Sequence, residues 1–169
     1  IFNSEINLKR DLENRTLNIE SKFSDLQIKN YDLGELNINI FGNTDYNSYA
    51  LKIDLLKDKL SSIKGEGSII GANAEPNIDI DLIFENFDIS FIEKIGTNTM
   101  TSISSNVSGE VNLWGKSNNI QHNGKLYLNE SRFTVPYLNI EYFLSENSEI
   151  DLYNQNFEIN NVKAPIISC

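Results

Sequence analysis

Side chains that could act as acids, bases or metal ligands are few in this chain. The sequence holds one histidine, His122, and one cysteine, Cys169, among 169 residues. General acid–base catalysis and metal binding need several such groups converging on one point, and a lone histidine beside a turn is more typical of a surface position. We therefore expect no catalytic residue, no metal site and no cofactor, and the protein is not predicted to be an enzyme.

A pair of aspartates offers the nearest approach to an acidic site. Asp79 and Asp81 are two residues apart and would share one face of an extended strand. The same face carries Asn77, and Asn or Lys takes the corresponding place in similar segments, so a solvated strand face is the better interpretation. Glycine-rich phosphate loops, nucleophile elbows and calcium loops are missing from the sequence.

The charge balance limits the class of partner. The chain has 14 basic and 24 acidic residues and a formal charge of −10, whereas phosphate binding depends on clustered Lys and Arg. We expect no nucleic-acid partner. Because the acidic residues are spread over polar strand positions, they are better explained as a solvated face than as a cation site.

The length suits one domain, and residues 1–169 are interpreted as a single β-rich segment. No stretch approaches the roughly 20 apolar residues that cross a bilayer, and the first residues do not resemble a signal peptide. We expect the chain to be a piece of a longer protein, and we expect membrane contact only through parts outside this fragment.

Alternation of apolar and polar residues is the dominant pattern. Across residues 77–84 every even position is apolar and the odd positions are polar apart from Ile83, which predicts a strand with one buried face. Polar turns separate such segments. The same alternation occurs at residues 17–20, 35–40, 49–55, 125–129, 138–142 and 157–160.

These strands predict an all-β fold, a meandering or solenoid-like sheet without a fixed repeat length. One helix is predicted near residues 88–95, because Ile89, Ile92 and Ile95 are three residues apart, Asp88 suits an N-cap and Gly96 suits a C-terminal stop. With so little helix, either the sheet folds over on itself or something other than protein covers its apolar face.

The order of features over residues 78–162 resembles the C-terminal conserved region of the bacterial TamB family, relatives of the AsmA-like and bridge-like lipid transfer proteins. The family often has an apolar residue near His122, so this position departs from its pattern. The features that carry the resemblance are a strand at 78–84, a short helix near 88–95, and then the segments 107–115, 124–128 and 133–142.

The resemblance implies an elongated amphipathic sheet curled into an open U-shaped groove (a β-taco or loose β-solenoid) with one short helix. It also implies a periplasmic location, a full-length protein anchored in the inner membrane, and an Omp85-type outer-membrane partner. The implied ligands are phospholipid acyl chains that move between the inner and outer membranes.

A monotonous apolar row suits such transport, because each acyl methylene gains about 0.8 kcal/mol on leaving water and neighbouring positions are nearly equivalent. The residues predicted to line the groove are the large apolar members of the alternating segments. They are Leu36, Ile38, Ile40, Leu51, Ile53, Ile78, Ile80, Leu82, Val111, Leu113, Leu126, Leu128, Phe133, Val135, Leu138 and Ile140.

Three alternatives stay open at this point. The same residues could form the filled core of an ordinary sandwich. A strand edge could instead template client strands by β-augmentation, as expected of an outer-membrane protein assembly or translocation factor acting with the Omp85-type partner. Acidic, Asn-rich strands also occur in structural or adhesive extracellular β-solenoids.

Overall fold

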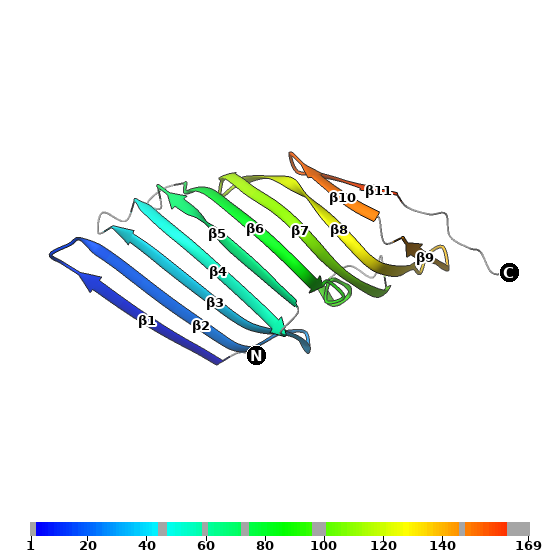
Figure 1. Cartoon of the computed structure of the whole chain (residues 1–169), viewed down its shortest axis with the longest axis horizontal. Coiled ribbons are helices and arrows are strands. Elements are labelled where there is room, and N and C mark those ends of the chain that lie inside the picture. The colour runs from blue at the N-terminus through cyan, green and yellow to red at the C-terminus, as the bar shows by residue number, and fades with distance from the viewer. Residues whose placement is uncertain are drawn as a thin grey trace.

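The computed structural model describes residues 3–43, 47–58, 61–71, 75–95, 101–145 and 148–161, which form one open antiparallel sheet and one short helix (Figure 1). The all-β prediction is confirmed. The helix is α1 (Ile92–Ile95). The strands are β1 (Asn3–Asp11), β2 (Thr16–Ile28), β3 (Tyr31–Asn43), β4 (Ser48–Asp58), β5 (Ser61–Ile70), β6 (Asn77–Asp88), β7 (Thr101–Lys116), β8 (Asn119–Val135), β9 (Ile140–Leu144), β10 (Ser148–Tyr153) and β11 (Asn156–Asn160).

The strands form a meander in which each pairs with the next along the chain from β1 to β8. The outer edge of β8 then divides between two partners. Residues 123–128 pair with β10, and residues 131–135 pair with β9. Because β11 pairs with β10, the path begins at β1 and ends at β11 without closing into a barrel (Figure 1).

Antiparallel register places the apolar residues of successive strands on the same side of the sheet. Residues directly opposite each other share a face, so the partners Ile19, Ile40 and Leu51 lie side by side, as do Ile80 and Leu113. We call this side the apolar face and the opposite side the polar face. The sequence alternation therefore predicted the two faces correctly.

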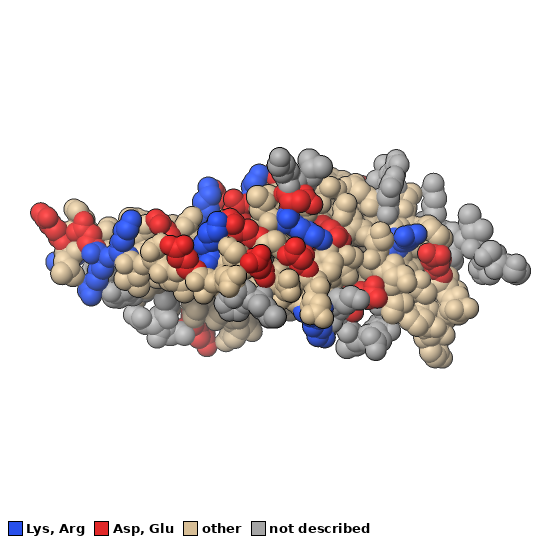
Figure 2. Space-filling view, turned by 90° about the horizontal axis from the view of Figure 1, so that it is seen from below, with Lys and Arg blue, Asp and Glu red and all other residues tan. Residues whose placement is uncertain are grey.

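Ion pairs join neighbouring strands on the polar face. Lys52 Nζ lies 2.9 Å from Glu66 Oε1, and Lys64 Nζ lies 2.8 Å from Glu85 Oε2. In Figure 2 basic and acidic side chains are intermixed over the middle of the molecule. Exposed pairs of this kind contribute little stability, so their main consequence is a well-hydrated surface.

Asp79 and Asp81 belong to the same polar face and do not form an isolated acidic site. The side-chain amide of Asn112 donates to both carboxylates, at 3.0 Å to Asp79 and 2.9 Å to Asp81. Trp114 lies opposite Asp79 and is thus also on the polar face. Its side chain therefore lies on the opposite side of the sheet from Val111.

A compact core occupies only one end of the apolar face. Its buried members are Leu33, Phe87, Val107, Leu128 and Leu144. The chain after β6 folds over this end, where the Phe91 ring packs edge-on against Phe87 with centroids 6.2 Å apart. Within the described ranges no second sheet covers the apolar face, so the sandwich alternative receives no support.

The predicted helix is shorter than expected. A helix is present at Ile92–Ile95, but Asp88 is still the last residue of β6, and a short turn at residues 90–91 precedes the helix. The backbone N–H of Ser90 donates to Asp88 Oδ1 at 2.9 Å, so the carboxylate closes a local turn instead of starting the helix. The predicted stop at Gly96 lies outside the described residues.

The predicted strand at residues 138–142 begins two residues late. Leu138 lies in the turn between β8 and β9, where its N–H donates to the Val135 carbonyl at 3.1 Å, and it is half exposed. Asn139 has a φ of 50°, which breaks the extended backbone. Leu138 is therefore not part of the apolar face, and that predicted lining residue is wrong.

Candidate functional site: the apolar face

The predicted lining residues other than Leu138 all lie on the apolar face, where cross-strand pairing arranges them in rows. One row passes through Ile38, Ile53, Leu82 and Val111, and Val111 pairs in turn with Gly124 of β8. The register thus brings together side chains that are far apart in sequence.

The rows extend beyond the predicted residues at both ends of the sheet. At one end Ile6 pairs with Ser21 and Leu8 pairs with Ile19. At the other end Phe157 pairs with Leu152. These positions could have been found in the sequence, because 5–10 and 156–160 also alternate, and they lengthen the apolar face from β1 to β11.

Outside the core, no other element among the described residues packs on the apolar face, although Val111 in the middle of the sheet is only 7% exposed. Ile6 is 61% exposed, Leu8 63% and Phe157 70%, while Ile40 and Ile80 in the middle of the sheet are half-buried by their strand neighbours alone. A contiguous apolar surface of this kind marks a site for an apolar partner or ligand.

Glycines on the apolar face bring neighbouring backbones close together. A Cβ added to Gly67 would meet the Asp79 carbonyl oxygen at 2.1 Å, and one added to Gly124 would meet that of Glu110 at 2.2 Å. Only glycine tolerates such an approach. These positions leave shallow gaps between the bulky side chains of the rows.

The position of His122 differs from the surface position that the sequence predicted. It pairs opposite Leu113 in β7 and therefore lies on the apolar face. Its Nδ1 is buried, with no hydrogen-bond partner in the described part of the chain. The backbone carbonyl of His122 accepts from the Asn154 N–H at 2.9 Å, so the strand pairing around it is intact.

A polar network of Tyr31, Lys57 and Asp88 lies next to the core. Lys57 Nζ lies 2.8 Å from Asp88 Oδ2 and 4.2 Å from the centroid of the Tyr31 ring. The Tyr31 hydroxyl bonds to both Lys57 and Asp88. Tyr31 also stacks obliquely on Phe91 at 5.9 Å, which joins the network to the core.

The network stabilises both of its charged groups. Burial raises the pKa of Asp88, but hydrogen bonds from Lys57, Tyr31 and Ser90 outweigh it and hold that pKa below its usual range. Burial likewise lowers the pKa of Lys57, and the bonds to Asp88 and Tyr31 more than compensate, so the pKa is raised. Both groups are charged near neutral pH, in a structural role.

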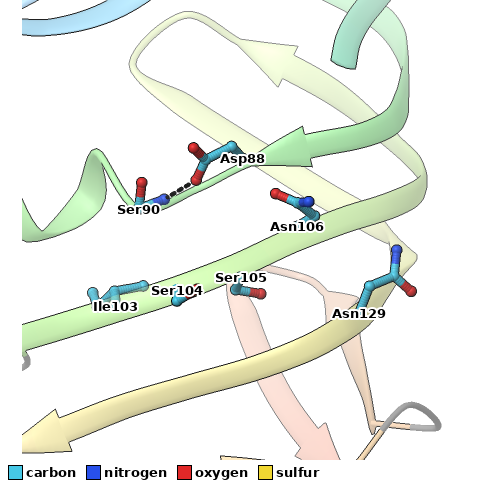
Figure 3. Close-up of a pocket in the computed structure, with 7 residues that line it drawn as sticks. All are labelled: Asp88, Ser90, Ile103, Ser104, Ser105, Asn106 and Asn129. Atoms are coloured by element: carbon cyan, nitrogen blue, oxygen red, sulfur yellow. Dashed lines mark hydrogen bonds between the residues drawn. The ribbon is translucent and has the colours of Figure 1, made fainter. Parts of the chain in front are cut away.

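A polar pocket of about 320 Å³ lies beside this network, where the pairing of β7 and β8 shifts register. Figure 3 shows Asp88 and Ser90 on one side of it, joined by their hydrogen bond, with Asn106 and Asn129 on neighbouring strands. Among the described residues that line it, Asp88 is the one carboxylate, and it is already paired with Lys57. The pocket therefore offers no pair of groups for acid–base chemistry.

Comparisons with protein-family models, curated proteins and solved structures gave no match. The likeness to the TamB family thus stays a prediction from the sequence. Within the described residues no three His, Cys, Asp or Glu side chains converge as a metal site would require. No helix in the same ranges has the length and apolar character needed to cross a membrane.

Proposed function

We propose that this chain is a segment of a lipid conduit, whose apolar face carries phospholipid acyl chains while its polar face stays in water. The observation that supports this proposal is the set of apolar rows from β1 to β11, uncovered over most of their length in the described part of the chain. The resemblance to TamB supports a periplasmic path between the inner and outer membranes with an Omp85-type partner.

The spacing of the rows favours sliding over tight binding. A chain that moves from Ile40 to Leu51 advances one strand, about 4.8 Å, and meets an aliphatic side chain of the same size. Each methylene kept out of water is worth about 0.8 kcal/mol. Where aliphatic partners follow one another, as at Ile19, Ile40 and Leu51, successive positions offer similar burial, and the barrier between them is small compared with the cost of leaving the face. Gly67 and His122 interrupt the same row.

We further propose that the sheet curls toward its apolar face to form the U-shaped groove of the full-length protein. Glycines at apolar-face positions support this, since Gly67 and Gly124 remove side-chain bulk from the inner side of such a bend and glycines introduce curvature into sheets. A curled sheet would exclude water from the sides of the acyl chains, which a flat sheet leaves exposed to solvent.

Site-specific photocrosslinking in cells tests the conduit. A photoreactive residue placed at Ile40 or Ile80, both half-buried on the apolar face, is expected to capture phospholipid. The matched controls are the adjacent polar-face positions Asn39 and Asp79, which should capture none. Leu128 is unsuitable because it is only 3% exposed. Adducts at neither pair, or equal adducts at both, would overturn the conduit.

A second function, assembly of outer-membrane proteins, is favoured by the free edge of the sheet. All nine residues of β1 are exposed, and the strand pairs only with β2 within the described residues. An edge of this kind can accept a client strand by β-augmentation. Proline at Asn7 and Leu8 would then abolish crosslinks from β1 to client strands while lipid adducts at Ile80 persist.

A further inference from the structure

The edge of the sheet at β1 carries charges that are placed symmetrically about the middle of the strand. The central residue of β1 is Asn7, with Glu5 two residues before it and Lys9 two residues after it. All nine residues are exposed, and β2 is the only partner strand of β1 in the part of the chain that the structure describes (Figure 1). The edge is therefore long and open enough to pair with another strand.

A second copy of β1 complements this pattern. If two β1 strands pair antiparallel with Asn7 opposite the partner's Asn7, each Glu5 lies opposite the partner's Lys9, and each Ile6 lies opposite the partner's Leu8. Directly opposite residues share a face, so opposite charges meet on the polar face and aliphatic side chains meet on the apolar face. The strand is thus complementary to itself.

Charge also selects this register over its neighbours. Sliding one copy by two residues keeps the two faces but moves the facing pairs. In one direction Glu5 comes to lie opposite the partner's Asp11, and in the other it lies opposite the partner's Asn7. Like charges directly opposite each other destabilise a strand pair, and neither shift keeps the two pairs of opposite charges. The register centred on Asn7 is therefore favoured.

The two charged groups have no ion-pair partner within one copy. Glu5 and Lys9 are about 13 Å apart along the strand, and neither belongs to an ion pair among the described residues. Glu5 Oε1 accepts a hydrogen bond from the side-chain amide of Asn7 at 3.3 Å. On the inner strands a lysine pairs with a carboxylate across the sheet, as Lys52 does with Glu66. Pairing of two β1 strands would give the edge the same kind of ion pair.

We propose that two copies of this chain associate through β1 as an antiparallel pair with twofold symmetry. Such an interface uses the same surface on both copies and closes at a dimer. Nine facing residue pairs form about eight to ten main-chain hydrogen bonds. The twofold axis is perpendicular to the sheet, so the two apolar faces lie on the same side and join at Ile6 and Leu8. The dimer does not depend on lipid as the ligand of the joined face.

Disulfide crosslinking tests the register. In the 169-residue chain with its one cysteine removed by Cys169→Ser, Asn7→Cys places two thiols at the twofold axis. Facing Cα atoms there are about 4.5–5.5 Å apart, which is within the range of disulfides. Oxidation should give a covalent dimer. Asn3→Cys is the matched control, because its two copies would be about 27 Å apart and should not crosslink. Equal crosslinking by both variants, or by neither, would overturn the proposal.

Charge reversal gives an independent readout of the same pairing. Glu5→Lys would place lysines opposite each other, and Lys9→Glu would place carboxylates opposite each other. Each variant alone should dimerise at least about tenfold more weakly, a factor equal to about 1.4 kcal/mol. An equal mixture of the two variants should recover the dimer, because opposite charges then face each other at both positions. Analytical ultracentrifugation measures the masses.

Recovery in the mixture separates the interface from folding. Glu5 also lies opposite Lys22 of β2, so Glu5→Lys would weaken that pairing within one copy as well. A loss of dimer caused only by damage to the fold would persist in the mixture, and that result would contradict the proposal.

The remaining outcomes identify other occupants of the edge. A monomer at every protein concentration would refute self-association and leave the edge to client strands. Masses above a dimer would indicate open-ended association, such as pairing of β1 with the partner's β11, and would also refute it. A dimer that resists both charge reversals and dissociates in detergent would be held by the apolar face instead. None of these results decides whether Ile80 captures lipid, so the dimer and the conduit are tested separately.

Discussion

Replacing Phe87 with alanine should show that one end of the sheet holds most of its packing energy. Phe87 is 2% exposed and packs edge-on against Phe84 at 6.5 Å and Phe91 at 6.2 Å. Truncating a buried Phe costs about 3–5 kcal/mol, and aromatic pairs of this geometry contribute about 0.5–1.5 kcal/mol each beyond burial. We therefore expect a loss of about 4 kcal/mol.

The assay is urea unfolding followed by far-ultraviolet circular dichroism and by fluorescence of Trp114, the chain's one tryptophan. With a slope of about 2 kcal/mol per molar urea, the midpoint should fall by about 2 M. Phe157→Ala is the matched control, since Phe157 is 70% exposed on the same face, and it should cost less than about 1 kcal/mol. Equal losses in the two variants would refute the reasoning.

Three further outcomes follow from the same structure. Gly124→Ala should lower the melting temperature in thermal unfolding, because its φ is 155° and the new Cβ would lie 2.2 Å from the Glu110 carbonyl oxygen; an unchanged temperature would contradict the close approach. Asp88→Asn should destabilise the protein at pH 7. Its difference from the unsubstituted chain should shrink as the pH falls below about 4, because the folded-state pKa of Asp88 is depressed: the stabilisation is complete above the unfolded pKa and is lost progressively as the pH falls toward the folded-state pKa. Lys52→Ala should leave the melting temperature unchanged, since its ion pair with Glu66 is exposed. A clear decrease would show that the ion pairs of the polar face contribute substantially to stability.

The two faces of the sheet were predictable because a strand has only one way to separate alternating residues. Once Ile80 and Leu82 were assigned to the apolar side, pairing with β5 and β7 left no freedom for their neighbours. The strand predicted at Leu138 was wrong because the sequence around it alternates, while the backbone of the next residue, Asn139, adopts a positive φ. Alternation alone does not report where an extended backbone stops.

The position of the core was not predictable from the sequence. Val107 belongs to an alternating segment, and Phe87 follows a register shift after Phe84; nothing in the sequence marks either residue as nearly inaccessible, which both are. Their burial depends on the chain after β6 folding back over one end of the sheet, which is a tertiary event. The surface position predicted for His122 was wrong for a related reason. Only its even spacing from Leu126 indicates that this polar residue lies on the apolar face.

The meander has a consequence for how such a protein could change its length. Because each strand from β1 to β8 pairs only with its neighbours in the chain, a hairpin of two strands is a self-contained module, and its removal or duplication restores both strand direction and face. Each hairpin adds about 10 Å across the strands. A sheet of this design can therefore be lengthened in hairpin steps to match the distance it has to cover, without redesign of the strands already present.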